Sequence, residues 1–209
     1  MDIYGIFIQI VVLVFSVIVH EVSHGLAAYK LGDPTAKDMG RLTLNPIPHI
    51  DPFMSILMPV FLLFSHAGFI IGGAKPVPIN PMYFRHHRRD IMLTSLAGPG
   101  SNLLLALVCV LLLKVVRMVP LLEASALNIL LNYGVLINVG LAIFNLLPIP
   151  PLDGSKVLAF FLPAKAEIVY YRIEPYGIFI LIGLMALGGF NIIFVPVYTF
   201  VIKLFSMIL

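Results

Sequence analysis

Residues 3–29 read IYGIFIQIVVLVFSVIVHEVSHGLAAY, a nearly uninterrupted apolar run with two histidines and a glutamate near its C-terminal end. As a helix, a run of this length crosses about 30 Å of hydrocarbon, because each residue adds about 1.5 Å. Ionisable side chains are costly inside a membrane and usually mark a functional site there. The stretch therefore predicts a membrane-spanning helix that carries a reactive group.

The polar residues in this run form the motif His20-Glu21-Val22-Ser23-His24. On a helix, residues four positions apart share a face, so His20 and His24 can bind a single zinc ion. Glu21 stands beside them, where a carboxylate can act as a general base. The alternative is a surface helix with polar contacts between neighbouring turns. The seventeen nearly uninterrupted apolar residues before the motif argue against that alternative.

Composition places the chain among integral membrane proteins. Hydrophobic residues make up 60% of the 209 and charged residues only 11%, with a mean hydropathy of +1.05. Soluble domains usually contain about a quarter charged residues. The net charge of +3 then belongs to loops at the lipid surface and does not indicate nucleic-acid binding. The single cysteine, Cys109, provides no disulfide framework.

The order of apolar stretches predicts an all-α polytopic membrane protein. We expect a helical bundle with one re-entrant segment and short membrane-associated strands. The first stretch lacks a basic flank and a cleavage site, so we expect a retained helix and not a signal peptide. Residues 176–209 are long enough for one tilted span or for a hairpin broken at Gly188-Gly189. The apolar stretches are residues 3–29, 52–73, 93–119, 126–147 and 176–209.

A hydrolytic zinc site needs a third protein ligand and an open fourth position. Residues 145–154, NLLPIPPLDG, interrupt an apolar helix with three prolines and deliver Asp153 just past the break. Broken helices at membrane depth are tolerated where they are buried in protein or line a wet cavity. Asp153 is therefore a candidate ligand. Capping of a helix that starts near Ser155 is an equally open alternative for this residue.

These motifs together resemble the site-2 protease family of intramembrane zinc metalloproteases. The sequence AGPGSN at residues 97–102 adds to the resemblance, which covers roughly Val19 to Leu158. Two more segments, GRLTLNP at 40–46 and GAKPVP at 73–78, are similar to those of the compact bacterial members. Neither a PDZ insertion nor a CBS domain is visible.

The resemblance implies the roles of the site residues. His20, His24 and Asp153 would bind one zinc ion per chain, and Glu21 would be the catalytic base. The substrate would be a transmembrane segment of another protein, cleaved in regulated intramembrane proteolysis. Residues 1–209 would form a single intramembrane protease domain, with a catalytic core at about 3–162 and one or more membrane segments at 176–209.

Asn102 and Asn145 are expected to line a polar path to the metal and to orient the scissile peptide or stabilise an oxyanion. Interhelical hydrogen bonding is an equally weighted alternative for both. Residues 73–79 are rich in Pro and Gly and can present a strand edge to an unwound substrate, or serve only as a connector. The candidates for substrate contact in this segment are Gly73, Ala74, Lys75, Pro76 and Val77.

The metal site also predicts the membrane topology. His20 and His24 lie toward the C-terminal end of the first helix, and Asp153 must reach the same depth. Residues 52–73 must then enter and return, because a full span there would end the helix before Asp153 on the opposite face. Ten of the twelve loop cations considered then share one side, which the positive-inside rule assigns to the cytoplasm. The ten are Lys30, Lys37, Arg41, Lys75, Arg85, Arg88, Arg89, Lys156, Lys165 and Arg172, against Lys114 and Arg117.

The run of basic residues and histidines at 85–89 is expected to face lipid headgroups. Two other functional classes share parts of the pattern. A zinc or proton-coupled transporter also buries His and Asp at broken helices, but typically shows inverted repeats, and none is visible in this sequence. An inactive relative acting as a membrane chaperone would have lost Glu21 or a metal ligand, whereas all four residues are present. No oligomeric state is predicted.

Overall fold

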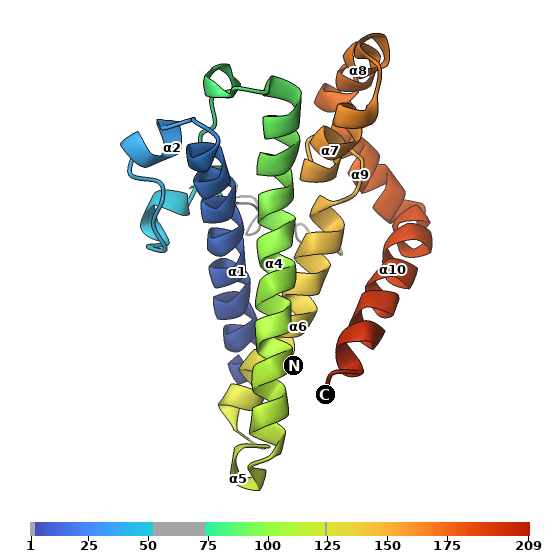
Figure 1. The fold of residues 1–209 in the computed structure, drawn as a ribbon. Helices are drawn as coiled ribbons and strands as arrows, with labels where there is room; N and C mark the ends of the chain where they lie inside the picture. Colours follow the sequence, from blue (N-terminus) through green and yellow to red (C-terminus); the bar gives the residue numbers. More distant parts are fainter. Residues whose placement is uncertain (1–2, 52–73, 124) are drawn as a thin grey trace.

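Three long helices form the centre of the molecule (Figure 1): α1 (Ile3–Lys30), α4 (His87–Arg117) and α6 (Ala126–Asn145). The computed structural model describes residues 3–51, 74–123 and 125–209. In these residues four helical stretches are long and apolar enough to cross a membrane, namely the three central helices and Ala164–Ala186. The expected all-α polytopic architecture is therefore confirmed.

Shorter elements surround the central helices. Two of them, α7 and α8, follow the proline-rich break after α6, and two more make up the C-terminal segment. Listed with their bounds, the shorter elements are α2 (Thr35–Asp38), η1 (Ile47–His49), η3 (Pro81–Tyr83), α5 (Pro120–Glu123), α7 (Asp153–Phe161), α8 (Ala164–Tyr171), η4 (Glu174–Tyr176), α9 (Gly177–Ala186) and α10 (Gly189–Ser206).

The buried face of α1 explains how the histidines come to lie inside the bundle. Buried residues recur every four positions along this helix, which is the spacing of one helical face. They are Val12, Ser16, His20, His24 and Ala28. Large apolar side chains such as Phe7 and Phe15 cover the exposed side, where a bilayer would lie. The motif histidines therefore lie on the packed face of a membrane helix.

An apolar core fills the half of the bundle away from the histidines. It joins the second half of α4 to α6, and α10 packs against it with Phe194, Tyr198 and Val201. Close apolar packing is a main source of association between helices in a membrane, since lipid is as apolar as the side chains. The core residues are Ala106, Val110, Leu113, Val116, Leu131, Val135, Val139 and Ile143.

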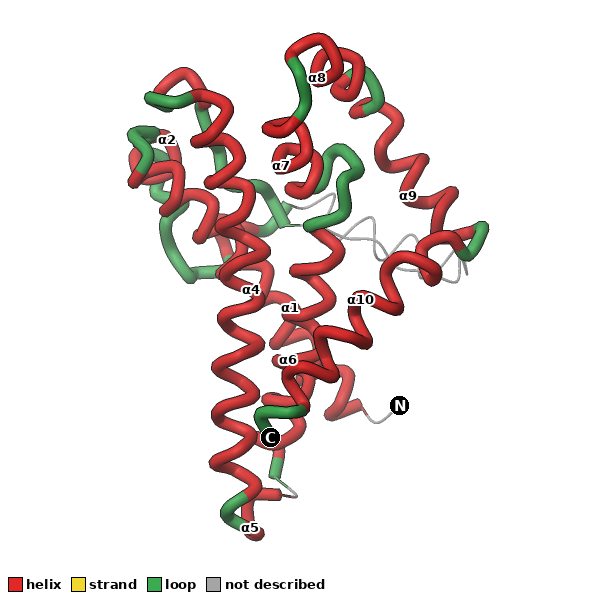
Figure 2. The backbone as a smooth tube through the Cα atoms, turned by 45° about the vertical axis from the view of Figure 1, so that its right-hand side comes forward, coloured by secondary structure: helices red, strands yellow, loops and turns green. Residues whose placement is uncertain are grey.

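The C-terminal segment makes one broken crossing. The helix breaks between α9 and α10 at Gly188, whose φ of 74° suits glycine. Figures 1 and 2 show that both helices continue toward the end of the molecule that holds the N-terminus. Lys114 near the end of α4 donates a hydrogen bond to the Ile208 carbonyl at 2.9 Å. Of the two alternatives for residues 176–209, the bent single passage is the one observed.

The chain enters and leaves residues 52–73 at one end of the bundle. The backbone N–H of Lys75 donates to the carbonyl of His49 at 2.8 Å, so the two flanking segments lie together. This proximity agrees with the topology required by Asp153. The expected re-entrant segment itself lies outside the described residues.

The expectation of short strands is wrong for the part of the chain that the structure describes. Residues 74–80 have no regular secondary structure, and no β-ladder forms there. Side chains take up the backbone groups instead: Arg41 donates to the Lys75 carbonyl at 2.8 Å, and Glu21 accepts from the Val77 N–H at 2.8 Å. Pro76 and Pro78 have no N–H to give to a neighbouring strand.

Candidate metal centre

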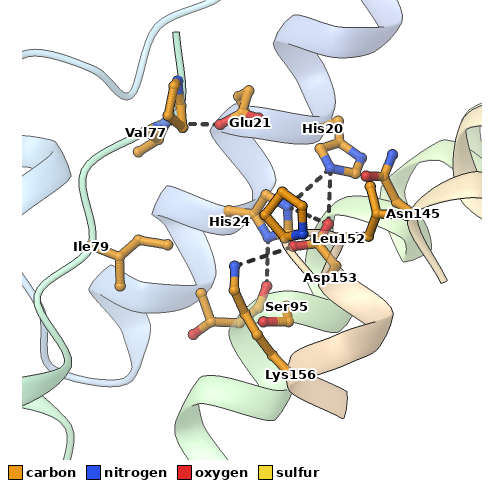
Figure 3. Close-up of a pocket in the computed structure, with 13 residues that line it drawn as sticks. His20, Glu21, His24, Val77, Ile79, Ser95, Asn145, Leu152, Asp153 and Lys156 are labelled. Carbon is orange, nitrogen blue, oxygen red and sulfur yellow. Dashed lines mark hydrogen bonds and ion pairs between the residues drawn. The ribbon is translucent and has the colours of Figure 1, made fainter. Parts of the chain in front are cut away.

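His20, His24 and Asp153 converge on one point between α1 and α7. The Nε2 atoms of the two histidines are 3.0 Å apart, and Asp153 Oδ2 lies 3.2 Å from His20 Nε2 and 3.1 Å from His24 Nε2. All three residues are buried. Figure 3 shows the three side chains pointing toward one another. The fold therefore brings together the three side chains that were predicted from the sequence as candidate metal ligands.

The spacing of these atoms fits a tetrahedral metal ion. Bonds of about 2.0–2.1 Å in tetrahedral geometry place ligand atoms about 3.3 Å apart, close to the separations found here. The alternative of a helix cap does not describe Asp153, because the α7 N-terminus has no side-chain cap and the Asp153 carboxylate faces the histidines. Three ligands leave a fourth position open, as in catalytic zinc sites.

Hydrogen bonds on the far side of each ring determine its tautomer. His20 Nδ1 donates to Asn102 Oδ1 at 2.6 Å, and His24 Nδ1 donates to the Thr94 carbonyl at 2.7 Å. Each neutral ring then directs the lone pair of Nε2 toward the other ring and Asp153. Electron-rich atoms this close repel one another unless a cation or protons lie between them. This arrangement favours a metal ion at their centre.

A buried amide network supports Asn102. Its Nδ2 donates to Asn138 Oδ1 at 2.8 Å and to the Ser16 carbonyl at 3.3 Å. Asn138 Nδ2 in turn donates to Ser16 Oγ at 2.8 Å. The network ties α1, α4 and α6 together one turn from His20. Asn102 is fully buried behind the ring and does not line the cleft.

Gly98 allows α4 to pass directly over the histidines. A Cβ at this position would lie 2.6 Å from His20 Nε2 and closer still to His24 Nε2. Real Cβ atoms do not approach other atoms so closely, so any side chain would displace the rings. The AGPGSN segment thus contributes both a close approach at Gly98 and the amide of Asn102.

The proline-rich break places Asp153 at the first position of α7. The Leu152 N–H donates to the Ile149 carbonyl at 2.9 Å, which closes the loop. The Tyr170 hydroxyl donates to the Pro148 carbonyl at 2.8 Å. At the other end of α7, Arg88 Nη2 donates to the carbonyls of Ala159 at 2.9 Å and Leu162 at 2.5 Å. A cation at a helix C-terminus satisfies its free carbonyls and its dipole. Arg88 is therefore a structural cap, whereas the sequence placed it at lipid headgroups.

The surroundings of Asp153 favour its ionised, anionic form. Burial disfavours the ionised form of the Asp153 carboxyl, whereas the charge of Lys156 favours it, as a metal ion between the three candidate ligand atoms would. Lys156 Nζ lies 3.6 Å from Asp153 Oδ1. The carboxylate therefore offers one oxygen to the histidines and the other to an ammonium group.

Comparison with known proteins shows which family this chain belongs to. The profile of peptidase family M50 matches residues 112–188. Over 187 residues the chain is 38% identical to YwhC of Bacillus subtilis, covering 87% of this chain and 82% of YwhC. It is 30% identical to Rip2 of Mycolicibacterium smegmatis over 191 residues, covering 90% of this chain and 70% of Rip2. Both relatives are named "Putative zinc metalloprotease". This chain belongs to peptidase family M50, the site-2 protease family. No solved structure matches it significantly.

In this M50 member a cleft of about 200 Å³ opens beside the three candidate ligands. We call it the metal cleft. Glu21 and Val77 form part of one wall, and Asn145 lies near His20 (Figure 3). The Asn145 amide donates to the Leu141 carbonyl at 3.0 Å, within its own helix. The lining residues are His20, Glu21, His24, Pro76, Val77, Ile79, Thr94, Ser95, Asn145, Pro151, Leu152, Asp153 and Lys156.

The other predicted substrate contacts divide between the cleft and its surroundings. Pro76 and Val77 line the metal cleft, whereas Ala74 and Lys75 precede them in the chain and are not among its lining residues. Gly73 is outside the described residues. Arg41 is buried and donates to the carbonyls of Lys75 and Pro76, so it secures the segment that contacts Glu21.

Sequence reasoning missed Asn138 and the structural roles of Arg41 and Arg88. Asn138 lies in an apolar stretch just as Asn145 does, and the only available signal was a polar side chain at membrane depth. That signal did not distinguish the two asparagines. Arg41 was counted only as a loop charge, although its side chain is buried. A buried guanidinium with carbonyl partners cannot be recognised before the fold is known.

Proposed function

We propose that this chain is a zinc metalloprotease that hydrolyses a peptide bond within or next to a transmembrane segment of another protein. One observation carries the proposal: three ligand atoms lie 3.0–3.2 Å apart inside a bundle of apolar helices, with Glu21 next to them in the sequence. The names of its relatives and its membership of family M50 support the protease chemistry.

His20, His24 and Asp153 would hold one zinc ion per chain. When bound, zinc supplies a Lewis acid that polarises a carbonyl group and acidifies water. Two neutral imidazoles and one carboxylate leave a small net charge with a dication, which lowers the cost of burial. Asn102 would act as a positioning residue, because it holds the His20 ring through Nδ1.

Glu21 is the proposed general base and acid. It follows His20 directly, and its carboxylate forms part of the wall of the metal cleft. It would accept a proton from the attacking water and deliver it to the leaving amine. The Val77 N–H donates to Glu21 Oε2 at 2.8 Å. This hydrogen bond orients the Glu21 carboxylate.

The depth of the site favours a membrane-embedded substrate. His20 is ten residues from the end of α1, which corresponds to about 15 Å along a helix. A helical substrate hides its peptide bonds and must unwind to reach the cleft. Residues 73–77 are proposed to contact the unwound segment, together with Asn145 on the other side of the metal. Residues 1–209 are proposed to act as one domain, with the zinc site toward the cytoplasm.

The test is cleavage of a co-expressed single-span protein by the purified or membrane-embedded chain. We expect about one zinc ion per wild-type chain, and strongly reduced zinc in His20→Ala, His24→Ala and Asp153→Ala. Glu21→Gln is the matched control, since it is nearly isosteric and should retain zinc while losing turnover. Zinc transport without cleavage would support a transporter instead. Full zinc content in Asp153→Ala would remove that ligand from the site.

A further inference from the structure

A second cavity of about 280 Å³ adjoins the metal cleft and has no part in the chemistry described above. We call it the adjoining pocket. It shares four lining residues with the metal cleft, so the two spaces have a common boundary. Figure 3 shows three of these residues, Ile79, Ser95 and Lys156, beside His24 and Asp153. The shared residues are Ile79, Thr94, Ser95 and Lys156.

The chemistry of the adjoining pocket differs from that of the cleft. The rest of its lining consists of Pro81, Phe84, Ile91 and Tyr171, which are apolar or aromatic. Among the described residues that line the pocket none is acidic, and Lys156 is the one cation. An apolar cavity of about 150 Å³ is enough to hold a benzene ring. The pocket therefore suits a large uncharged side chain, whereas a cationic side chain would lose its hydration against the apolar walls.

The walls of the adjoining pocket are held in place on both sides. Ile79 lies between two anchored residues, because the Val77 N–H bonds to Glu21 and the Asn80 N–H donates to Asp33 Oδ2 at 2.6 Å. On the opposite wall, Ile91 and Thr94 belong to the long helix α4. A preformed pocket loses little binding free energy to ordering its own side chains.

We propose that the adjoining pocket is a specificity subsite for a large apolar side chain, such as Leu or Phe, on the substrate residue next to the scissile bond. The proposal rests on the proposed protease function and adds the chemical class of the side chain recognised. Full burial of such a side chain strengthens binding roughly ten- to hundredfold. The subsite would select the position of cleavage within an unwound segment.

Hydroxamates of N-acetylated amino acids test this proposal without a known substrate. The zinc-loaded full chain in detergent is titrated with the glycine, leucine, phenylalanine and lysine compounds, in which only the side chain next to the metal-binding group varies. We expect the leucine and phenylalanine compounds to bind at least tenfold more tightly than the glycine compound. The lysine compound should gain nothing over glycine.

Ile91→Trp should fill the adjoining pocket, because Ile91 lines it and does not line the metal cleft. We expect this variant to lose the preference for large side chains and to bind the glycine compound as the wild type does. Leu93→Trp is the matched control, since Leu93 is 41% exposed on the same helix. If Ile91→Trp does not fold, Ile91→Ala enlarges the pocket and should shift the preference toward a naphthylalanine compound.

Failure of the subsite and failure of the metal centre give different binding results. Equal, zinc-dependent binding of the glycine, leucine and phenylalanine compounds would overturn the subsite and leave the pocket to another occupant, such as a lipid acyl chain. A preference that survives in Ile91→Trp would overturn it as well. If none of the compounds bound the zinc-loaded chain, the proposed metal centre would fall, and the subsite with it.

Discussion

The orientation of each histidine ring depends on a residue far away in the sequence. Asn102 lies 82 positions from His20, and Thr94 lies 70 positions from His24. Both accept a hydrogen bond from Nδ1, which leaves Nε2 free to bind a metal ion. Such partners contribute to metal affinity although they never touch the ion. The two histidines of the HExxH motif thus obtain the hydrogen bonds that orient their rings only when α4 packs against α1.

We expect Asn102→Leu to lower zinc affinity about 10- to 100-fold, the usual effect of removing a partner of a metal-ligating histidine. Competition with a chelator in detergent measures the affinity. Asn145→Leu is the matched control, because the Asn145 amide donates to the Leu141 carbonyl of its own helix. Equal zinc affinity in wild type and Asn102→Leu would show that His20 does not depend on this hydrogen bond.

Gly98→Ala should disrupt the centre through steric overlap. The new methyl group would lie 2.6 Å from His20 Nε2, and overpacking of this kind typically costs about 1–3 kcal/mol. We expect reduced zinc content and a lower temperature of unfolding. Gly100→Ala, two residues along the same helix, has open space around its Cβ and should keep the zinc content of the wild type. Identical behaviour of the two variants would contradict the close approach of α4.

At the scale of single elements, α7 connects the candidate metal centre to the rest of the bundle. Its first residue, Asp153, faces the histidines, and its last carbonyls accept hydrogen bonds from Arg88 of α4. Gly154 lets the helix start against the loop that precedes it, because a Cβ there would overlap the backbone of Leu146 and Leu147. A nine-residue helix has little stability of its own, so these contacts determine where its ends lie.

Arg88→Gln should therefore weaken zinc binding from the far end of α7. Hydrogen bonds that involve a charged group contribute about 1.5–3 kcal/mol each, and loss of the cap would let α7 shift and fray. We expect at least a tenfold loss of zinc affinity, measured by chelator competition. Arg85→Gln removes an exposed cation from the same run and should have no such effect. If both variants bound zinc equally well, the cap would not position Asp153.

At the scale of the whole molecule, the site requires the ends of three helices to lie at the same end of the bundle. The end of α1, the start of α4 and the end of α6 lie toward the same end of the bundle, as Figure 1 shows. His49 and Lys75, on either side of residues 52–73, are joined by a backbone hydrogen bond. The loops that carry most of the basic residues then share one membrane face, and we propose from the positive-inside rule that this face is cytoplasmic.

Single cysteines in a Cys109→Ser background test this orientation. Cysteines at Lys37, Arg85 and Lys165, all exposed positions near the metal side, should resist a membrane-impermeant thiol reagent added outside intact cells. A cysteine at Leu121, which is 88% exposed in the opposite loop, should react. Permeabilised cells provide the control for reactivity. The reverse labelling pattern would place the metal site on the outer side.

The sequence predicted well what depends on residues that are close together in the chain. Apolar length predicted the membrane helices, because each helix must satisfy its own backbone hydrogen bonds in lipid. The HExxH spacing predicted that two imidazoles share a face, since helical geometry alone places them there. The break before Asp153 also indicated a third ligand, although it left the choice between a ligand and a cap open.

Only the tertiary structure decided which distant groups complete the site. Asn102 bonds to His20, and α4 passes close to both histidine rings at Gly98. Arg88 caps α7 through the carbonyl of Ala159, which is 71 positions away in the sequence. The strand edge expected at residues 73–79 did not form in the described residues 74–79, because side chains from other parts of the chain bond to the backbone there. Periodicity and composition describe what each residue prefers locally, whereas hydrogen-bond partners and close approaches arise only from the packing of helices against one another.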